Sequence, residues 1–99
     1  MLYVILGKDA ANSLKTRLAN RPIHLERLRE LKNTGRLLLA GPLPAIDTAD
    51  PGSAGFNGSL IVAEFPSLEE ARHWAEADPY LSTGVYRTIT VKPFIKVLP

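Results

Sequence analysis

Residues 21–25 read Arg21-Pro22-Ile23-His24-Leu25 and begin a predicted helix that continues to about Thr34. Pro22 suits the first position of a helix, where its missing N–H costs nothing and its fixed φ is already helical. Gly35 follows the last helical residue, in the place where a left-handed backbone conformation commonly ends a helix. Residues 8–20 are more polar, and we expect them to form a short separate helical lead-in with Ser13 as its cap.

The inward face of the main helix carries titratable and charged groups. Leu25, Leu28 and Leu31 recur three residues apart and form an apolar stripe that must face a core. Counting roughly 100° per residue, His24 lies at the edge of that stripe, and Arg21 projects from the same side. His24 is therefore either a half-buried side chain with a local hydrogen bond or a functional group, and a partner elsewhere would favour function.

Four apolar runs are predicted strands, and they are separated by the helix above and by a second helix. The runs are Leu2–Gly7, Arg36–Leu43, Gly58–Phe65 and Val85–Lys96. The order β-α-β-β-α-β is that of a ferredoxin-like α+β sandwich, and right-handed crossovers place both helices on the same face of the sheet. The strands also carry apolar residues at consecutive positions, so the opposite face is apolar too. We expect a homodimer that covers this sheet face with a second copy.

The second helix begins after Pro66, where Ser67 and Glu70 have the spacing of a capping box. Trp74 lies on its apolar stripe and is a predicted core residue, whereas His73 lies beside the stripe and is predicted to be exposed. The helix ends before Asp78-Pro79, because a residue that precedes proline resists the α conformation.

The composition limits the classes of function. Ninety-nine residues form one domain, residues 1–99, and the formal charge of +2 comes without any run of Lys or Arg. Nucleic acid is therefore not an expected partner. The chain has no cysteine, no signal-peptide pattern and no apolar stretch near the ~20 residues of a membrane span. We expect a cytoplasmic protein that needs no membrane.

The segment 45–57 is rich in turn residues and much longer than a hairpin requires. It is interpreted either as a tolerated surface loop or as a flap over a pocket.

Asp78 is the candidate partner of His24. Both helices lie on one face of the sheet, so the two residues are able to meet near one end of it. The alternative is that Asp78 only caps the short turn Pro79–Ser82. A metal site made of His24, His73 and Asp78 lacks ligand spacing on any one element, so we expect neither a metal nor another cofactor.

The chain resembles the YciI-like family, within the dimeric α+β-barrel group that also holds muconolactone isomerase-like enzymes. The matching motifs follow one another along nearly the whole chain: 21–25, Gly35-Arg36-Leu37, Ala40-Gly41-Pro42, Asp50-Pro51-Gly52, Gly58-Ser59, Ser67-Leu68-Glu69-Glu70-Ala71, Asp78-Pro79-Tyr80, Gly84-Val85-Tyr86 and Val91-Lys92-Pro93-Phe94. The resemblance implies a homodimer with a pocket in which His24 and Asp78 act together.

Such a pair supports acid–base chemistry, since the carboxylate fixes the tautomer and leaves the other ring nitrogen to take or give a proton. Isomerisation, elimination or a lyase- or hydrolase-type step on a small organic acid is the resulting hypothesis. The candidate substrate-binding residues are Arg21, Arg17, Tyr80, Gly41, Pro42 and Ser59. A charge-balancing surface role is the alternative for both arginines.

Two interpretations from other classes of function stay open. The first is a non-catalytic dimer that binds a small ligand or a protein. The second is an RNA-binding module with the same element order, but residues 59–63 of the third strand offer no aromatic side chain for stacking. The RNA interpretation is therefore disfavoured.

Overall fold

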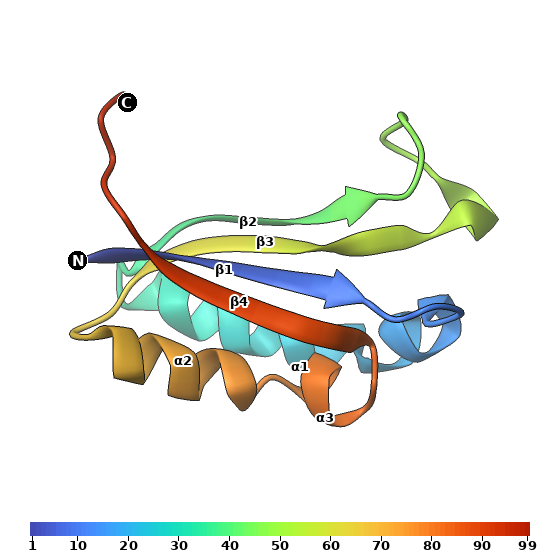
Figure 1. Cartoon of the computed structure of the whole chain (residues 1–99), viewed down its shortest axis with the longest axis horizontal. Coiled ribbons are helices and arrows are strands. Elements are labelled where there is room, and N and C mark those ends of the chain that lie inside the picture. The colour runs from blue at the N-terminus through green and yellow to red at the C-terminus, as the bar shows by residue number, and fades with distance from the viewer.

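The computed structural model describes all 99 residues, and Figure 1 shows the chain from end to end. The elements in chain order are β1 (Leu2–Asp9), α1 (Leu14–Asn33), β2 (Leu37–Pro44), the 3-10 turn η1 (Gly52–Ala54), β3 (Phe56–Glu64), α2 (Leu68–Glu76), α3 (Pro79–Ser82) and β4 (Tyr86–Phe94). None of the helices has the length and apolar character that crossing a membrane requires.

The four strands form one antiparallel sheet in the order β2-β3-β1-β4, and all three helices cover the same face of it (Figure 1). The predicted ferredoxin-like α+β fold is confirmed. The main core lies between the sheet and the helices and consists of Tyr3, Ile5, Leu31, Ile61, Ala63, Phe65, Ala71 and Ala75. Alternate strand residues point into this core, as the period of two along a strand requires.

The first helix differs from the prediction. Residues 14–33 form one continuous helix with Pro22 inside it, so the separate lead-in and the helix start at Pro22 are both wrong. Pro22 removes the hydrogen bond to the carbonyl of Leu18, but both residues are exposed, so water can bind that carbonyl instead. Ser13 precedes the helix as expected, yet its side chain makes no capping hydrogen bond.

The remaining local predictions agree with the structure better than the prediction for the first helix does. Gly35 has φ 72° and ends α1 in the left-handed region, as expected. The hydroxyl of Ser67 accepts a hydrogen bond from the Glu70 N–H at 3.1 Å, which confirms the cap of α2. Trp74 is half-buried and packs against the edge of the core, and His73 is exposed.

The sheet face away from the helices is apolar and has no cover within this chain. Leu6 of β1 is 41% exposed and Leu39 of β2 is 48% exposed, although both lie within strands of the sheet. Leu43 and Phe94 are also exposed, on β2 and β4. Because a monomer rarely leaves such a surface open, this face is a candidate association surface.

Two glycines of the sheet, Gly7 of β1 and Gly58 of β3, are closely approached by neighbouring strands. A Cβ atom on Gly58 would overlap the carbonyl oxygen of Gly7, and a Cβ atom on Gly7 would overlap the ring of Tyr86. Glycine is therefore required at both positions by close approach and not by backbone conformation. The space above Gly7 allows Tyr86 of β4 to lie flat on the strand.

Candidate active site

The buried line of α1 carries two polar side chains. Arg17, His24 and Leu31 are the buried residues of this helix and are spaced seven residues apart, so they lie almost in one row along it. Arg17 is 5% exposed and His24 is 6% exposed. Buried polar side chains are stable only where they have hydrogen-bond or ionic partners, and other elements of the fold supply these partners.

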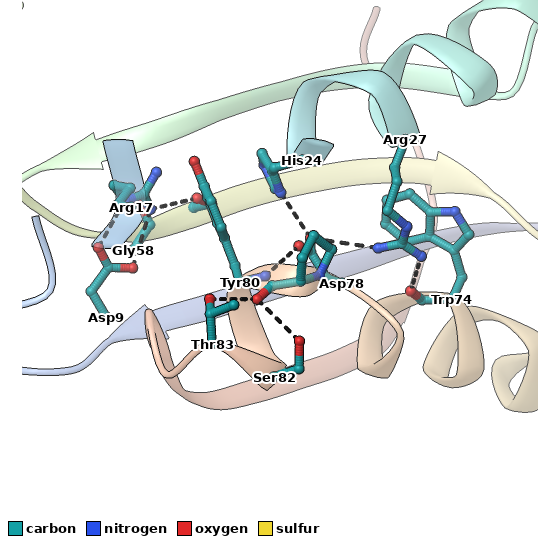
Figure 2. Close-up of polar contacts among 12 residues, drawn as sticks. Asp9, Arg17, His24, Arg27, Gly58, Trp74, Asp78, Tyr80, Ser82 and Thr83 are labelled. Atoms are coloured by element: carbon teal, nitrogen blue, oxygen red, sulfur yellow. Dashed lines mark hydrogen bonds and ion pairs between the residues drawn. The ribbon is translucent and has the colours of Figure 1, made fainter. Parts of the chain in front are cut away.

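His24 meets Asp78, as Figure 2 shows. The Nδ1 atom of the imidazole lies 2.8 Å from Oδ2 of Asp78, whose side chain is 2% exposed. The other carboxylate oxygen, Oδ1, accepts the Tyr80 N–H at 2.9 Å and so caps α3. Asp78 therefore both caps the short helix and contacts the histidine. Because a carboxylate only accepts hydrogen bonds, Nδ1 carries a hydrogen and donates it to Asp78, which leaves Nε2 as the ring nitrogen that is free to contact a ligand.

Tyr80 holds the imidazole from one side. Its ring stacks on His24 with 4.0 Å between centroids and an interplanar angle of 6°. Tyr86 packs edge-on against Tyr80 at 5.4 Å, so the histidine is backed by two aromatic rings. Burial raises the pKa of the Tyr80 phenol, and the nearby charge of Arg17 opposes this only in part. The phenol therefore stays neutral across the physiological range.

Arg17 is a buried cation with a fixed partner. Its Nε donates to Oδ2 of Asp9 at 2.9 Å and its Nη2 to Oδ1 at 3.1 Å, and Nη2 also reaches the Gly58 carbonyl and the Ser59 hydroxyl. Burial acts to lower the pKa of Arg17, but the hydrogen bonds and charge of Asp9 outweigh it, so the pKa is raised. A surface role for Arg17 is wrong, because the side chain is enclosed and its charge is balanced within the core.

A cavity of about 160 Å³ opens beside these groups. Its lining includes seven of the eight site residues proposed from sequence: Arg17, Arg21, His24, Gly41, Pro42, Ser59 and Tyr80. Asp78 is the exception and lies behind the histidine. Leu25, Leu28, Ala40 and Ile61 complete the wall, so about half of it is apolar. No residue of the 45–57 loop lines this cavity. In the single chain, this loop therefore does not act as a flap over its own pocket.

Arg21 differs from Arg17 in its surroundings. It is exposed at the cavity, and no carboxylate lies within ion-pair distance of its guanidinium. Arg21 is thus the cavity cation whose charge is available to a ligand.

Two charged residues near the site were not found from the sequence. Asp9 lies at the end of β1, where a short polar segment gave no sign that it would pair with Arg17. Arg27 lies three residues after His24 and 3.7 Å from Asp78. The sequence shows that Arg27 follows His24 by three residues, and residues at this spacing share a helix face. Nothing local in the sequence indicated the acidic partner of Arg27.

Comparison with known proteins finds relatives that match nearly the whole chain. Residues 1–95 match the family of YCII-related domains. The chain is 60% identical over 97 residues to Protein YciI of Escherichia coli O6:H1, covering 98% of this chain and 99% of that protein. It is 36% identical over 89 residues to the derivative of benzaldehyde biosynthesis cluster protein C of Emericella nidulans, covering 84% and 88% of the two chains.

A solved structure shares the fold. The chain superposes with a TM-score of 0.84 and 28% identity on 5-chloro-2-hydroxyhydroquinone dehydrochlorinase of Burkholderia phenoliruptrix, covering 96% of this chain and 94% of that one. That enzyme was solved in complex with 2,5-dihydroxybenzoquinone. The fold is therefore one that carries small-molecule catalysis.

Proposed function

The chain belongs to the YCII-related domain family, and from that premise we propose that it is a small-molecule enzyme whose His24–Asp78 pair performs acid–base chemistry. The observation that carries the proposal is the 2.8 Å contact between Nδ1 and Oδ2, with the imidazole lining a cavity. Asp78 holds the ring in one tautomer, and Nε2 is left to accept a proton from a ligand.

The substrate class follows from the cavity. Arg17 is already balanced by Asp9, so Arg21 offers one unpaired positive charge, and the rest of the wall is about half apolar. A small monoanion with an apolar body fits this arrangement, its carboxylate or enolate oxygen resting on Arg21.

The chemistry is proton removal from a carbon beside a carbonyl group. Nε2 takes the proton, and the electron pair moves into the C–C bond as the carbonyl oxygen becomes an enolate. Return of the proton to a different carbon gives isomerisation. In elimination the carbonyl re-forms, the enolate electrons make a new C–C double bond, and a group leaves the neighbouring carbon with its electron pair. The dehydrochlorinase with the same fold is named for a reaction of the second kind, which supports this choice.

The test is hydrogen–deuterium exchange in small keto acids, followed by ¹H NMR in D₂O with pyruvate, 2-oxobutyrate and acetoacetate as probes. The wild type is expected to accelerate exchange at the carbon beside the carbonyl, and His24→Gln to lower that rate by about 10²-fold or more. His73→Gln is the matched control, because His73 is exposed and does not line the cavity. Accelerated exchange that is equal in wild type and His24→Gln would contradict His24 as the base, and binding of the probes without any accelerated exchange would support the non-catalytic binding module instead.

We also propose that the enzyme is a homodimer through the apolar sheet face. A second copy related by a two-fold axis would cover Leu6, Leu39, Leu43 and Phe94 with the same residues of its partner. These side chains are aliphatic or aromatic, which favours sheet-on-sheet packing over a polar partner.

Substitution of Leu6 by Glu is expected to convert the dimer into a monomer at micromolar concentration, because two buried carboxylates would enter one interface. Light scattering after size exclusion measures the mass directly. Leu18→Glu is the control, since Leu18 is also exposed but lies on the outer side of α1. A wild type that elutes as a monomer, or a Leu6→Glu protein that remains a dimer, would contradict the sheet-face interface.

A further inference from the structure

Arg27 stands directly behind the His24–Asp78 pair. It follows His24 by one helical turn, and its Nη1 lies 3.7 Å from Oδ2 of Asp78, the oxygen that also contacts the imidazole. Figure 2 shows the guanidinium lying across the indole of Trp74, with its other nitrogen directed at the Trp74 backbone carbonyl. The guanidinium carbon is 4.2 Å from the indole centroid. The side chain is therefore clamped from two directions.

The clamp leaves one donor without a hydrogen bond. Nη1 is fully buried and has no hydrogen-bond partner, although the carboxylate of Asp78 lies just beyond bonding distance. An unpartnered buried donor on a cation is destabilising, so its position calls for a compensating interaction. The interaction that compensates is the electrostatic attraction between the Arg27 guanidinium and the Asp78 carboxylate, which is strong at this separation because water is excluded.

A buried carboxylate needs a compensating positive charge, and two groups at Oδ2 are able to supply it. One is the guanidinium of Arg27, and the other is His24 in its protonated form. If Arg27 supplies the charge, the imidazole is free to be neutral. A neutral imidazole keeps the lone pair on Nε2 that a base requires.

We propose that Arg27 is a positioning residue of the His24–Asp78 pair, which balances the charge of Asp78 so that the imidazole rests neutral and able to accept a proton. The role of Arg27 in catalysis rests on the proposed function. The charge balance among Arg27, Asp78 and His24 does not depend on that function. The other charged groups around His24 do not replace Arg27, because Arg17 is paired with Asp9 and Arg21 faces the cavity. Tyr80, which stacks on the ring, is a neutral phenol.

The test is ¹⁵N NMR of the imidazole nitrogens at neutral pH, in the full-length protein without substrate. In the wild type, His24 is expected to show one protonated nitrogen, Nδ1, and one bare nitrogen, Nε2. In Arg27→Met, Asp78 loses its arginine, and both nitrogens of His24 are expected to show the shifts of an imidazolium. Arg27→Lys, which keeps a positive charge, is expected to restore the wild-type pattern. The signals of His73 are identified from a His73→Gln sample.

Arg36→Met is the matched control. Arg36 lies 4.9 Å above the Phe65 ring and donates to the Glu64 backbone carbonyl, so it shares the aromatic and carbonyl contacts of Arg27 but not the carboxylate. Its removal is expected to leave the His24 signals unchanged. If Arg27→Met does not fold, Arg27→Gln, which keeps hydrogen-bonding capacity without charge, provides the same comparison.

A neutral His24 in Arg27→Met, or in Arg27→Gln where only that variant folds, would overturn the proposal, as would an imidazolium in the wild type. A shift that appears equally in Arg36→Met would also overturn it, because the effect would then be general loosening of the fold. Failure of the proposed enzyme activity leaves a different signature: no exchange with any keto acid, while the nitrogen signals still respond to Arg27. The two outcomes are therefore separable.

Discussion

Alanine in place of Gly58 is expected to lower the free energy of unfolding by about 3 kcal/mol or more. The added Cβ would overlap the carbonyl oxygen of Gly7, which is backbone of the adjacent central strand and has no rotamer to adopt. Strands β1 and β3 would have to separate at this point, and the Gly58 carbonyl would move away from Arg17. Thermal unfolding followed by circular dichroism measures the effect, with a fall on the order of 10–25 °C.

Gly41→Ala is the control for this substitution. Gly41 also lies in a strand, but a Cβ atom built there would meet no atom within 4 Å. Its melting temperature is expected to stay close to that of the wild type. A Gly58→Ala protein as stable as the Gly41→Ala protein would show that the strands separate at little cost, contrary to the close approach described above.

The fold was predictable because its signals are local. The apolar runs, the Ser67–Glu70 cap and the glycine after α1 each depend on neighbours in the sequence, and each is seen in the structure. Pro22 was misread for the opposite reason. Proline is favoured at a helix start, but packing of residues on both sides of it keeps one helix continuous. Tertiary contacts outweighed a local preference.

The site was predictable only in part. His24 was found because it lies beside an apolar stripe, and Asp78 was joined to it through the family resemblance. Arg27 and Asp9 were missed because a charge partner is defined by distance in space, and neither ion pair follows from a local sequence pattern. The predicted stripe does face inward, since Leu31 is buried and Leu28 packs against the core, but the most buried row of α1 also contains Arg17 and His24, where an apolar pattern expects leucine. Such a break in the pattern is expected at a functional site, as we propose for this one.

Replacement of Asp78 by alanine is expected to lower the free energy of unfolding by about 3–5 kcal/mol. Alanine removes the cap of α3, leaves the buried guanidinium of Arg27 without a counter-charge, and leaves Nδ1 of His24 without an acceptor. Asparagine keeps the cap, because Asn and Asp are equally good at that position, but it removes the charge. Denaturant titrations of the wild type, Asp78→Ala and Asp78→Asn therefore separate the cap from the ion pair.

Ser67→Ala measures how much a helix cap alone contributes to the free energy of unfolding. Ser67 accepts a backbone N–H at the start of α2 as Asp78 does at the start of α3, but it has no charged partner, and its loss is expected to cost about 1 kcal/mol. If Asp78 only capped α3, alanine there would cost the same as Ser67→Ala and asparagine would cost almost nothing. A large loss with both substitutions is expected instead, because the carboxylate charge is what His24 and Arg27 share. The stability of the fold and the tautomer of the histidine then depend on one side chain, and substitution of Asp78 changes both.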